Sequence, residues 1–346
     1  MPPPPDLAGA VVRWQRSHGR HGLPWQGTRD PYRVWLSEVM LQQTQVAVVL
    51  EYYPRFLQRF PDVQALAEAP LDDVLALWSG LGYYSRARNL HRCAQAVVGQ
   101  HGGRFPGTST TLATLPGIGR STAAAIAAFC FGERAAILDG NVKRVLTRAL
   151  GFDGDLSSAS QERALWQQAE ALLPGEGIEA YTQGLMDLGS GVCTLRRPAC
   201  LLCPLAAQCV AHAQGTPERY PVKTKKLRRG ARTHALLWLE QGGRLWLVQR
   251  PGTGVWAGLW SLPEFDSRET LQALAAGWPG QGAWLPDIAH TLTHFDWTLQ
   301  PLQWVWPDTP DAAALAPALP PGRWCTRTEA LALGLPAPVR KLLERD

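Results

Sequence analysis

The sequence has no uninterrupted apolar stretch near the length of about 20 residues that a membrane-spanning helix needs. Its first residues, MPPPPD, also lack the basic segment followed by an apolar segment that marks a secretory signal peptide. These absences argue against a membrane-spanning or secreted protein, and we expect a soluble intracellular one. In a reducing compartment its seven cysteines should be free thiols or metal ligands rather than disulfides.

Acidic residues are scarce in one short stretch, 217–232 (PERYPVKTKKLRRGAR), which has seven Lys and Arg against one Glu. Residues 1–216 carry a net charge of only +2 and residues 233–346 a net charge of −3, so most of the basic excess lies here. A Pro- and Lys/Arg-rich segment without apolar periodicity is typical of a linker. We therefore predict two domains, 1–216 and 234–346, joined by a basic linker, 217–233. The linker is either a solvated tether or a segment that follows phosphates.

A Gly-rich hairpin, Leu115–Gly119 (LPGIG), lies between two segments, 108–115 and 120–131, that the sequence predicts as helices. Its glycines permit a tight turn that a ligand can approach closely, and the free N–H groups at the start of the following helix attract an anion. Twenty residues after the hairpin, Asp139 begins another predicted helix. A hairpin that holds a phosphate, followed by a carboxylate, predicts chemistry on a nucleic acid.

A second carboxylate, Glu38, lies on the helix predicted over 32–44. Three of its four neighbours at helical spacing are apolar or aromatic, so Glu38 is either partly desolvated with a raised pKa or on a solvated face. Asp139 is expected to cap its helix, and a capping carboxylate that accepts backbone N–H groups should have a depressed pKa. One carboxyl that keeps a proton and one that stays charged form the pair that cleaves glycosidic bonds.

Two further clusters are notable. The turn at Gly80–Tyr84 presents two tyrosines beside Arg86 and Arg88, which suits stacking on bases, although tyrosines at a helix start also belong to cores. Four cysteines follow in the segment 193–209 with the spacing Cys-x6-Cys-x2-Cys-x5-Cys. This spacing predicts a metal site with Cys193, Cys200, Cys203 and Cys209 as ligands. A second Cys-x2-Cys knuckle, usual in zinc ribbons, is missing; the residues themselves leave zinc and an iron–sulfur cubane open.

The two halves differ in periodicity. The first half predicts helices almost throughout, including 7–20, 161–173 and 177–191. The second half alternates apolar residues with Gly and Trp turns, which predicts strands over 234–240, 244–250 and within 288–306, and helices over 266–276 and 328–344. The expected fold is mostly α for the first domain and α+β for the second.

Taken together, the segments SEVMLQQTQV, GLGYYSRARNL, LPGIGRSTA and ILDGNVKR and the cysteine spacing resemble the helix–hairpin–helix DNA glycosylases with an iron–sulfur cluster, and more narrowly the MutY-type adenine DNA glycosylases. The resemblance implies a [4Fe–4S] cluster on the four cysteines. It further implies a monomer of the bacterial cytoplasm, associated with the nucleoid, that binds double-stranded DNA. Its activity would be removal of adenine mispaired with 8-oxoguanine or guanine, which initiates base excision repair.

A lysine is absent directly after the hairpin, where Ser121 stands. Relatives that also nick the strand carry that lysine and form a Schiff base with the sugar. The resemblance therefore implies a monofunctional glycosylase that leaves an abasic site. An enzyme of the endonuclease III type, acting on oxidised pyrimidines, is the nearest alternative; a non-catalytic iron–sulfur protein that binds DNA or carries electrons is another.

Residues 234–346 resemble the Nudix-like domain with which this family recognises 8-oxoguanine. The magnesium-binding glutamates of Nudix hydrolases are missing: Gly258-x5-Glu264 begins their pattern, but 272–276 (QALAA) interrupts it. This absence disfavours a third alternative, a nucleotide pyrophosphohydrolase. The family reads the lesion with a Phe-Ser-His loop, and the matching residues here are Leu292, Thr293 and His294, which makes Thr293 and His294 the expected lesion contacts.

The resemblance also implies individual roles in catalysis. Glu38 would protonate the flipped adenine at N7, and Asp139 would stabilise the developing sugar cation, with support from Ser121 and Asn141. Gln43 and Tyr83 would wedge into the base stack. The implied adenine pocket comprises Trp25, Gln26 and Gln183, and the implied DNA contacts are Gln43, Thr44, Leu81, Tyr83, Arg86, Arg88, Gly117, Gly119 and Lys143.

Overall fold

The computed structural model describes residues 6–225, 229–308 and 319–345. Its contacts divide the chain into two compact units: Met1–Ala67 with Arg92–Lys226, and Glu68–His91 with Leu227–Asp346. The predicted boundary had placed 68–91 in the first domain. In the structure this segment groups with the C-terminal residues because it bonds to them directly: the Tyr84 hydroxyl donates to the Leu335 carbonyl oxygen at 2.9 Å.

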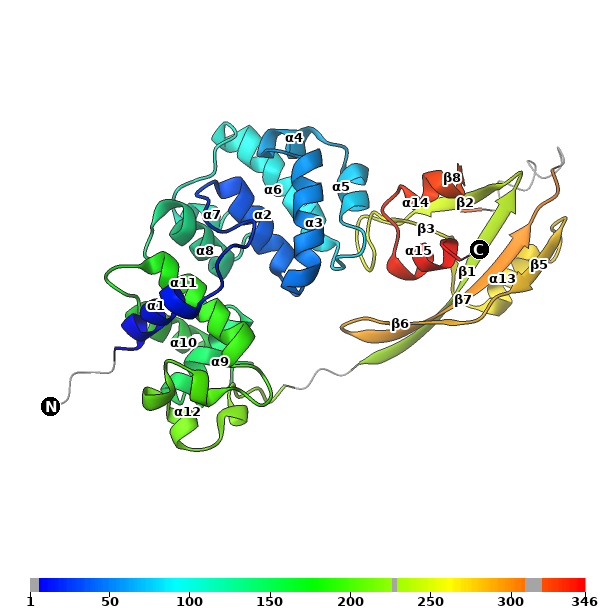
Figure 1. Cartoon of the computed structure of the whole chain (residues 1–346). Helices are drawn as coiled ribbons and strands as arrows, with labels where there is room; N and C mark the ends of the chain where they lie inside the picture. Colours follow the sequence, from blue (N-terminus) through cyan, green and yellow to red (C-terminus); the bar gives the residue numbers. More distant parts are fainter. Residues whose placement is uncertain (1–5, 226–228, 309–318, 346) are drawn as a thin grey trace. The chain divides into compact units, whose positions relative to one another are not determined.

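The first unit is helical, as predicted (Figure 1). The middle of its central helix, α8 (Arg120–Phe131), is buried: seven of the twelve residues are buried, and five of these seven are alanines. Helix α8 contacts α2, α7 and α11, while α9 contacts α10, α11 and α12. Besides α8, the helices of this unit are α1 (Leu7–His18), α2 (Pro31–Leu41), α3 (Val46–Arg59), α4 (Val63–Glu68), α6 (Ser85–His101, shared by both units), α7 (Ser109–Leu112), α9 (Gly140–Leu150), α10 (Ala159–Ala171), α11 (Ile178–Asp187) and α12 (Val210–Ala213).

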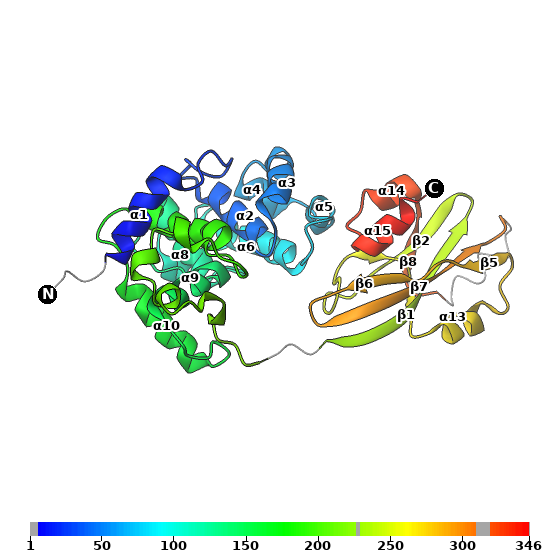
Figure 2. The same cartoon turned by 60° about the horizontal axis from the view of Figure 1, so that its bottom comes forward.

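The second unit is built on a sheet, which confirms the α+β prediction. Its two long strands, β1 (Gly230–Gln241) and β7 (Phe295–Val305), run parallel, and the main path of the sheet is β3-β2-β1-β7-β5. Helix α13 covers one face, and α14 and α15 lie on the other (Figure 2). The remaining elements are α5 (Leu71–Leu77), β2 (Arg244–Gln249), β3 (Trp260–Ser261), β4 (Glu264–Phe265), α13 (Arg268–Ala275), β5 (Gln281–Trp284), β6 (Ile288–Thr291), β8 (Gly322–Thr326), α14 (Arg327–Leu331) and α15 (Ala337–Leu343).

Three boundaries differ from the sequence prediction. The single helix expected over 328–344 is two helices, α14 and α15, because Gly334 and Pro336 interrupt it. Strand β1 begins at Gly230, inside the predicted linker, of which residues 226–228 lie outside the described residues. The helix expected over 177–191 ends at Asp187 and continues as a π-helical turn, Leu188–Val192. No helix of the described residues is long and apolar enough to span a bilayer.

Candidate active site

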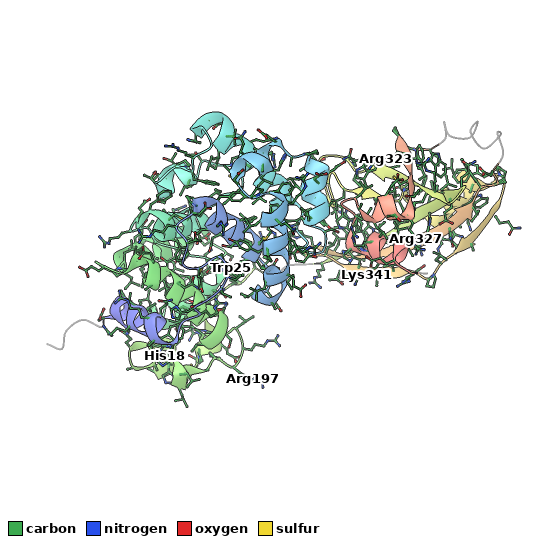
Figure 3. All side chains as sticks on the ribbon, turned by 45° about the horizontal axis from the view of Figure 1, so that its top comes forward. His18, Trp25, Arg197, Arg323, Arg327 and Lys341 are labelled. Carbon is green, nitrogen blue, oxygen red and sulfur yellow. The ribbon has the colours of Figure 1, made fainter. Side chains whose placement is uncertain are left out.

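A cavity of about 1350 Å³ opens in the first unit. Residues from the loop before α2, from α2 itself, from the first turns of α8 and α9, and from α11 line it. All seven residues predicted for catalysis or for the adenine pocket lie on its wall; Trp25, labelled in Figure 3, is one of them. The wall comprises, among others, Trp25, Gln26, Glu38, Thr44, Ser121, Asp139, Asn141 and Gln183. Segments far apart in the sequence thus meet at one site.

Glu38 is half-buried on α2, between the buried residues Ser37 and Val39. The helix starts where the sequence indicates, because Asp30 caps it by accepting the Tyr32 N–H at 2.9 Å. Burial and, to a smaller extent, the negative charge of Asp139 together raise the pKa of Glu38 to about 8. Of the two environments that the sequence left open, the desolvated one is present.

Asp139 caps α9, as predicted, by accepting the Val142 N–H at 2.8 Å. The expected depression of its pKa is wrong: burial raises the pKa of Asp139, and this outweighs the lowering by the backbone N–H groups of Val142 and Asn141 and by the charges of Arg144 and Lys143. The capping geometry was readable from the sequence, whereas the depth of burial was not.

Ser121 and Asn141 hold the surroundings of Asp139. The Ser121 hydroxyl accepts the N–H of Leu138 at 3.0 Å, which fastens the start of α8 to the residue before Asp139. Asn141 accepts from the Arg144 guanidinium at 2.8 Å, and Arg144 also donates to the Cys193 carbonyl oxygen at 2.7 Å. The cap of α9 is therefore linked through Arg144 to the cysteine segment.

The hairpin before α8 has the geometry of an anion site. Leu115 and Ile118 are buried, while Gly117 and Gly119 are exposed, so the apolar residues anchor the turn and its backbone faces solvent. Gly117 has a φ of +77°, which favours glycine, and Gly119 gives α8 no side-chain cap. Lys143, one of the implied DNA contacts, forms an ion pair with Glu162.

The four predicted metal ligands line one small apolar cavity against α9. Arg148 of α9 is almost wholly buried beside it and donates to Cys193 Sγ at 3.4 Å and to the Thr194 carbonyl oxygen at 2.7 Å. On the outer side of the segment, Arg196 and Arg197 are exposed, and Arg197 points away from the unit (Figure 3). The segment thus has an interior lined with thiols and a basic exterior.

Both predicted wedge residues have unusual backbone conformations. Gln43 and Tyr83 have φ values of +58° and +47°, and both side chains are exposed. Left-handed conformations cost a non-glycine residue of order 1–3 kcal/mol and cluster at functional sites. Tyr83 belongs to the second unit, where its hydroxyl lies 3.3 Å from Thr293 Oγ1.

Thr293 and His294 are exposed at the turn between β6 and β7. The turn is closed by the Leu292 N–H, which donates to the Phe295 carbonyl oxygen at 3.0 Å. The structure therefore places both predicted lesion contacts at a solvent-facing hairpin tip.

Three of the predicted DNA contacts are buried or have partners within the chain. Arg86 is buried and donates to the carbonyl oxygens of Leu81 and Gly82, at 3.0 and 3.2 Å. Leu81 is itself buried. Arg88 donates to the Ala257 carbonyl oxygen at 2.6 Å. These residues build the turn that presents Tyr83, because the carbonyl groups of a turn need buried donors; the sequence shows the charge of an arginine but not its partners.

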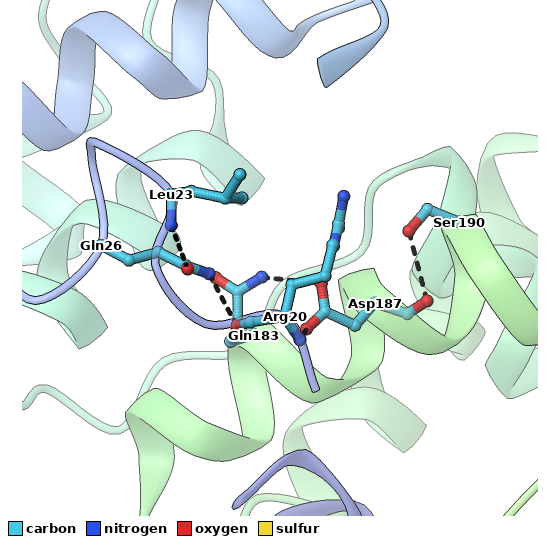
Figure 4. Close-up of polar contacts among 6 residues, drawn as sticks. All are labelled: Arg20, Leu23, Gln26, Gln183, Asp187 and Ser190. Atoms are coloured by element: carbon cyan, nitrogen blue, oxygen red, sulfur yellow. Dashed lines mark hydrogen bonds and ion pairs between the residues drawn. The ribbon is translucent and has the colours of Figure 1, made fainter. Parts of the chain in front are cut away.

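Sequence reasoning missed a polar network on the cavity wall (Figure 4). Asp187, whose side chain is 2% exposed, accepts from the backbone N–H of Arg20 at 2.9 Å and from its Nε at 2.6 Å. It also accepts from Gln183 Nε2 at 2.8 Å. The one available signal was an aspartate in the last turn of a helix, where its charge opposes the helix dipole.

Comparison with known proteins agrees with this geometry. A model of the HhH-GPD superfamily of base excision DNA repair proteins matches residues 36–171, and a NUDIX domain model matches residues 234–345. The solved structure of a thermostable thymine-DNA glycosylase is similar, with 29% identity and a TM-score of 0.54, over 60% of this chain and 95% of that chain. The two matched families correspond to the helical and the sheet-containing parts described above.

Two relatives that match more than nine-tenths of this chain identify the family more specifically. The adenine DNA glycosylase of Buchnera aphidicola subsp. Schizaphis graminum is 33% identical over 338 residues, which cover 96% of each chain. The human adenine DNA glycosylase is 34% identical, over 93% of this chain and 70% of that protein. The chain belongs to the family of adenine DNA glycosylases, enzymes of base excision repair.

Proposed function

We propose that the enzyme removes adenine mispaired with 8-oxoguanine or guanine from double-stranded DNA, and that it does so as a monomer without cutting the strand. The observation that carries the proposal is the pair of carboxyls on one cavity wall: Glu38, whose pKa is raised to about 8, beside Asp139, whose charge contributes to that rise. Within the described residues Glu38 has no donor that stabilises its anion, whereas Asp139 accepts backbone N–H groups, and two acids in such different surroundings can divide the tasks of proton donor and anion.

The mechanism follows from this division. The adenine nucleotide leaves the base stack and enters the cavity, as bases must for such chemistry. Protonated Glu38 donates its proton to N7, and the N-glycosidic bond breaks with its electron pair going to the base. The Asp139 carboxylate stabilises the sugar cation or bonds to it transiently. Glu38, now ionised, takes a proton from water, whose oxygen bonds to the sugar carbon and leaves an abasic site.

We expect no strand cleavage because the described part of the site lacks an amine that could attack the sugar. A Schiff base needs an amine near the sugar carbon. At the position after the hairpin stands Ser121, whose hydroxyl is engaged with the Leu138 N–H. Among the described residues that line the cavity there is no lysine. The site therefore supports hydrolysis of the base alone.

We propose a [4Fe–4S] cluster as the group held by Cys193, Cys200, Cys203 and Cys209. The four thiols surround one cavity, which fits a group with four corners. Around a single zinc ion, thiolates at about 2.3 Å from the metal would lie only about 4 Å apart. In the described part of the chain, no three His, Cys, Asp or Glu side chains are grouped so that they could hold one metal ion. When bound, the cluster would supply four metal–thiolate bonds that cross-link the cysteine segment 193–209, which packs against α9.

In the second unit, we propose that Thr293, His294 and Tyr83 recognise the 8-oxoguanine partner. The hydrogen bond between the hydroxyls of Tyr83 and Thr293 joins the wedge to the hairpin tip. Glu264, the one glutamate left from the Nudix pattern, is paired with Arg250 at 2.5 Å. An arginine there occupies the carboxylate that a hydrolase would offer to magnesium, so this unit favours recognition over pyrophosphate hydrolysis.

The proposed activity is tested by a single-turnover assay on duplexes with adenine opposite 8-oxoguanine, guanine, cytosine or thymine. We expect breaks only after alkali, because the product is an abasic site, and fast release only opposite 8-oxoguanine and guanine. Breaks without alkali would contradict the monofunctional mechanism. Equal rates opposite all four bases would contradict the mispair specificity.

The carboxyl pair predicts a pH dependence. A raised pKa means that Glu38 holds its proton at neutral pH and loses it above about 8, so the single-turnover rate should stay level up to pH 8 and then fall. Glu38→Gln should lower the rate by at least about 100-fold, the usual contribution of a proton donor. Asp139→Asn should lower it by about the same factor, because it removes the anion that stabilises the sugar cation.

The same variants should still bind the mispaired duplex, as measured by gel shift, because neither changes the fold. Stability supplies an independent check. Wild-type stability should fall as the pH rises from 4.5, the ordinary pKa of glutamate, to about 8, because only the folded state keeps the proton. Glu38→Gln should therefore melt higher than wild type above pH 8; a lower melting temperature there would argue against a buried, protonated Glu38.

The cluster predicts iron and acid-labile sulfide in equal amounts in the purified protein. Cys200→Ala should lose most of both and lower DNA binding, because the basic segment carrying Arg196 and Arg197 is then held by fewer bonds. Cys325→Ala is the matched control, since Cys325 is a buried free cysteine in the second unit. Zinc without sulfide in the wild-type protein would exclude the cluster.

The hairpin tip predicts a change in partner preference. Thr293→Ala with His294→Ala should lower the ratio of rates for adenine opposite 8-oxoguanine and opposite guanine by about tenfold, the value of one to two lost hydrogen bonds. Tyr83→Phe removes only the hydroxyl that bonds to Thr293 and should give a smaller change in the same direction. An unchanged ratio in all three variants would place lesion recognition elsewhere.

A further inference from the structure

Trp256 has a backbone conformation that a tryptophan rarely adopts. Among the described residues, four that are not glycine have left-handed φ values: Gln43, Tyr83, Arg197 and Trp256, the last at +56°. The first three are the two wedge residues and a residue of the basic cysteine segment. Trp256 lies instead in the loop 250–259 between β2 and β3. Because this conformation costs free energy, the contacts around Trp256 must hold it in place.

The indole ring of Trp256 packs against the base of the hairpin formed by β6 and β7. It stacks on Trp297, with ring centroids 4.6 Å apart and an interplanar angle of 16°, and its centroid lies 5.4 Å from that of the His290 ring. His290 and Trp297 are direct partners across the two strands. They stand three residues before Thr293 and three residues after His294, which form the exposed hairpin tip. The stack therefore holds the strand pair that carries the tip.

The next residue along the loop is bonded to the segment that carries Tyr83. Arg88, in the first turn of α6, donates from Nη1 to the Ala257 carbonyl oxygen at 2.6 Å. A hydrogen bond from a charged donor is stronger than one between neutral groups. The loop is itself braced by Arg250, whose Nε donates to the Val255 carbonyl oxygen at 3.1 Å. Adjacent residues of one loop thus contact the Tyr83 turn and the hairpin.

The Tyr83 turn and the hairpin tip are consequently joined in two ways. Directly, the Tyr83 hydroxyl lies 3.3 Å from Thr293 Oγ1, but both residues are exposed, so water competes for this hydrogen bond. The second connection runs through Trp256 and Ala257, which are buried. A single contact would leave the tip free to rotate about it, whereas two contacts on different sides fix both its distance and its direction.

We propose that Trp256 is a positioning residue for recognition of the 8-oxoguanine partner. Its stack on Trp297, with the adjoining bond from Arg88 to Ala257, holds the hairpin tip at a fixed place relative to Tyr83. 8-Oxoguanine differs from guanine in a carbonyl at C8 and an N–H at position 7, and hydrogen bonds to such groups depend steeply on distance and angle. A displaced tip therefore weakens recognition of the lesion more than that of guanine. The inference rests on the proposed function and adds to it a buried residue that acts through others.

A simpler role for Trp256 is to fill the core of the second unit. That role predicts a lower melting temperature when the ring is removed, and equal effects on adenine release opposite 8-oxoguanine and opposite guanine. A change in the ratio of the two rates, measured at a temperature where the variant is folded, separates the positioning role from the core-filling role.

The test is single-turnover release of adenine opposite 8-oxoguanine and opposite guanine. Trp256→Ala should lower the ratio of the two rates about tenfold, as for the loss of one to two hydrogen bonds. Trp256→Phe retains an aromatic ring against Trp297 and should keep most of the ratio. Trp256→Gly accepts a positive φ without strain but has no ring, so its ratio should be as low as that of Trp256→Ala. A wild-type ratio in Trp256→Gly or in folded Trp256→Ala would overturn the proposal.

Two further variants keep the test decisive if Trp256→Ala folds poorly. Arg88→Met removes the bond to Ala257 and leaves the stack intact, so it should lower the same ratio; an unchanged ratio would overturn the proposal. Trp304→Ala is the matched control, because Trp304 lies on the same strand as Trp297 but seven residues farther from the tip. It should lower the melting temperature and leave the ratio unchanged, and an equal fall in its ratio would favour the core-filling role.

Coupling to the tip distinguishes this inference from the proposed function. Adding Trp256→Ala to the variant with Thr293→Ala and His294→Ala should lower the ratio no further, because the positioned groups are already absent. A tip variant with an unchanged ratio would remove the proposed lesion contacts, and this inference with them. A lowered ratio in the tip variant together with unchanged ratios in Trp256→Ala and Arg88→Met would overturn this inference alone.

Discussion

The site depends on the burial of one carboxyl, Glu38, beside the charge of another, Asp139. Two carboxylates in one poorly solvated place cannot both be ionised without a large cost, so the group with fewer compensating donors keeps a proton. Burial is the largest influence on the pKa of both groups and raises both. At Asp139 two backbone N–H groups and nearby cations oppose it, whereas at Glu38 the charge of Asp139 adds to it. The difference in partners, rather than any difference between Asp and Glu, assigns the roles of anion and acid.

Helix α9 connects the carboxyl pair to the cysteine segment. Asp139 caps its first turn, Arg144 in its second turn bonds to Asn141 and to the Cys193 carbonyl oxygen, and Arg148 one turn later reaches Cys193 Sγ. Arg148 costs desolvation free energy to bury, and its several acceptors compensate that cost. A change in the cysteine segment would therefore displace the same helix that orients the Asp139 carboxylate.

The local features of this fold could be predicted from the sequence, and the features that depend on packing could not. Helix α8 and the cap of α9 follow from signals within a few residues of each other: a Gly-rich turn, an alanine-rich run and an aspartate before a helix. Whether Glu38 is desolvated, by contrast, depends on what other helices cover it. Arg86 looks like a DNA contact in sequence because its charge is visible and the carbonyl groups of its turn are not. The two-helix ending at α14 and α15 was missed although Gly334 and Pro336 were visible, because the apolar pattern continued across them.

Three of the carboxyl groups on the cavity wall differ in what surrounds them, and these surroundings determine whether each can donate a proton or carry a charge. Glu38 is half-buried and holds a proton that can be donated. Asp139 is held by backbone N–H groups and sits where positive charge would develop on the sugar. Asp187 is paired with Arg20 and accepts from Gln183, so it joins the loop before α2 to α11 at the cavity wall. Because a buried donor or acceptor that is left unpaired costs more than a formed hydrogen bond gains, a wall that offers one donor and one acceptor rejects bases whose edge does not match.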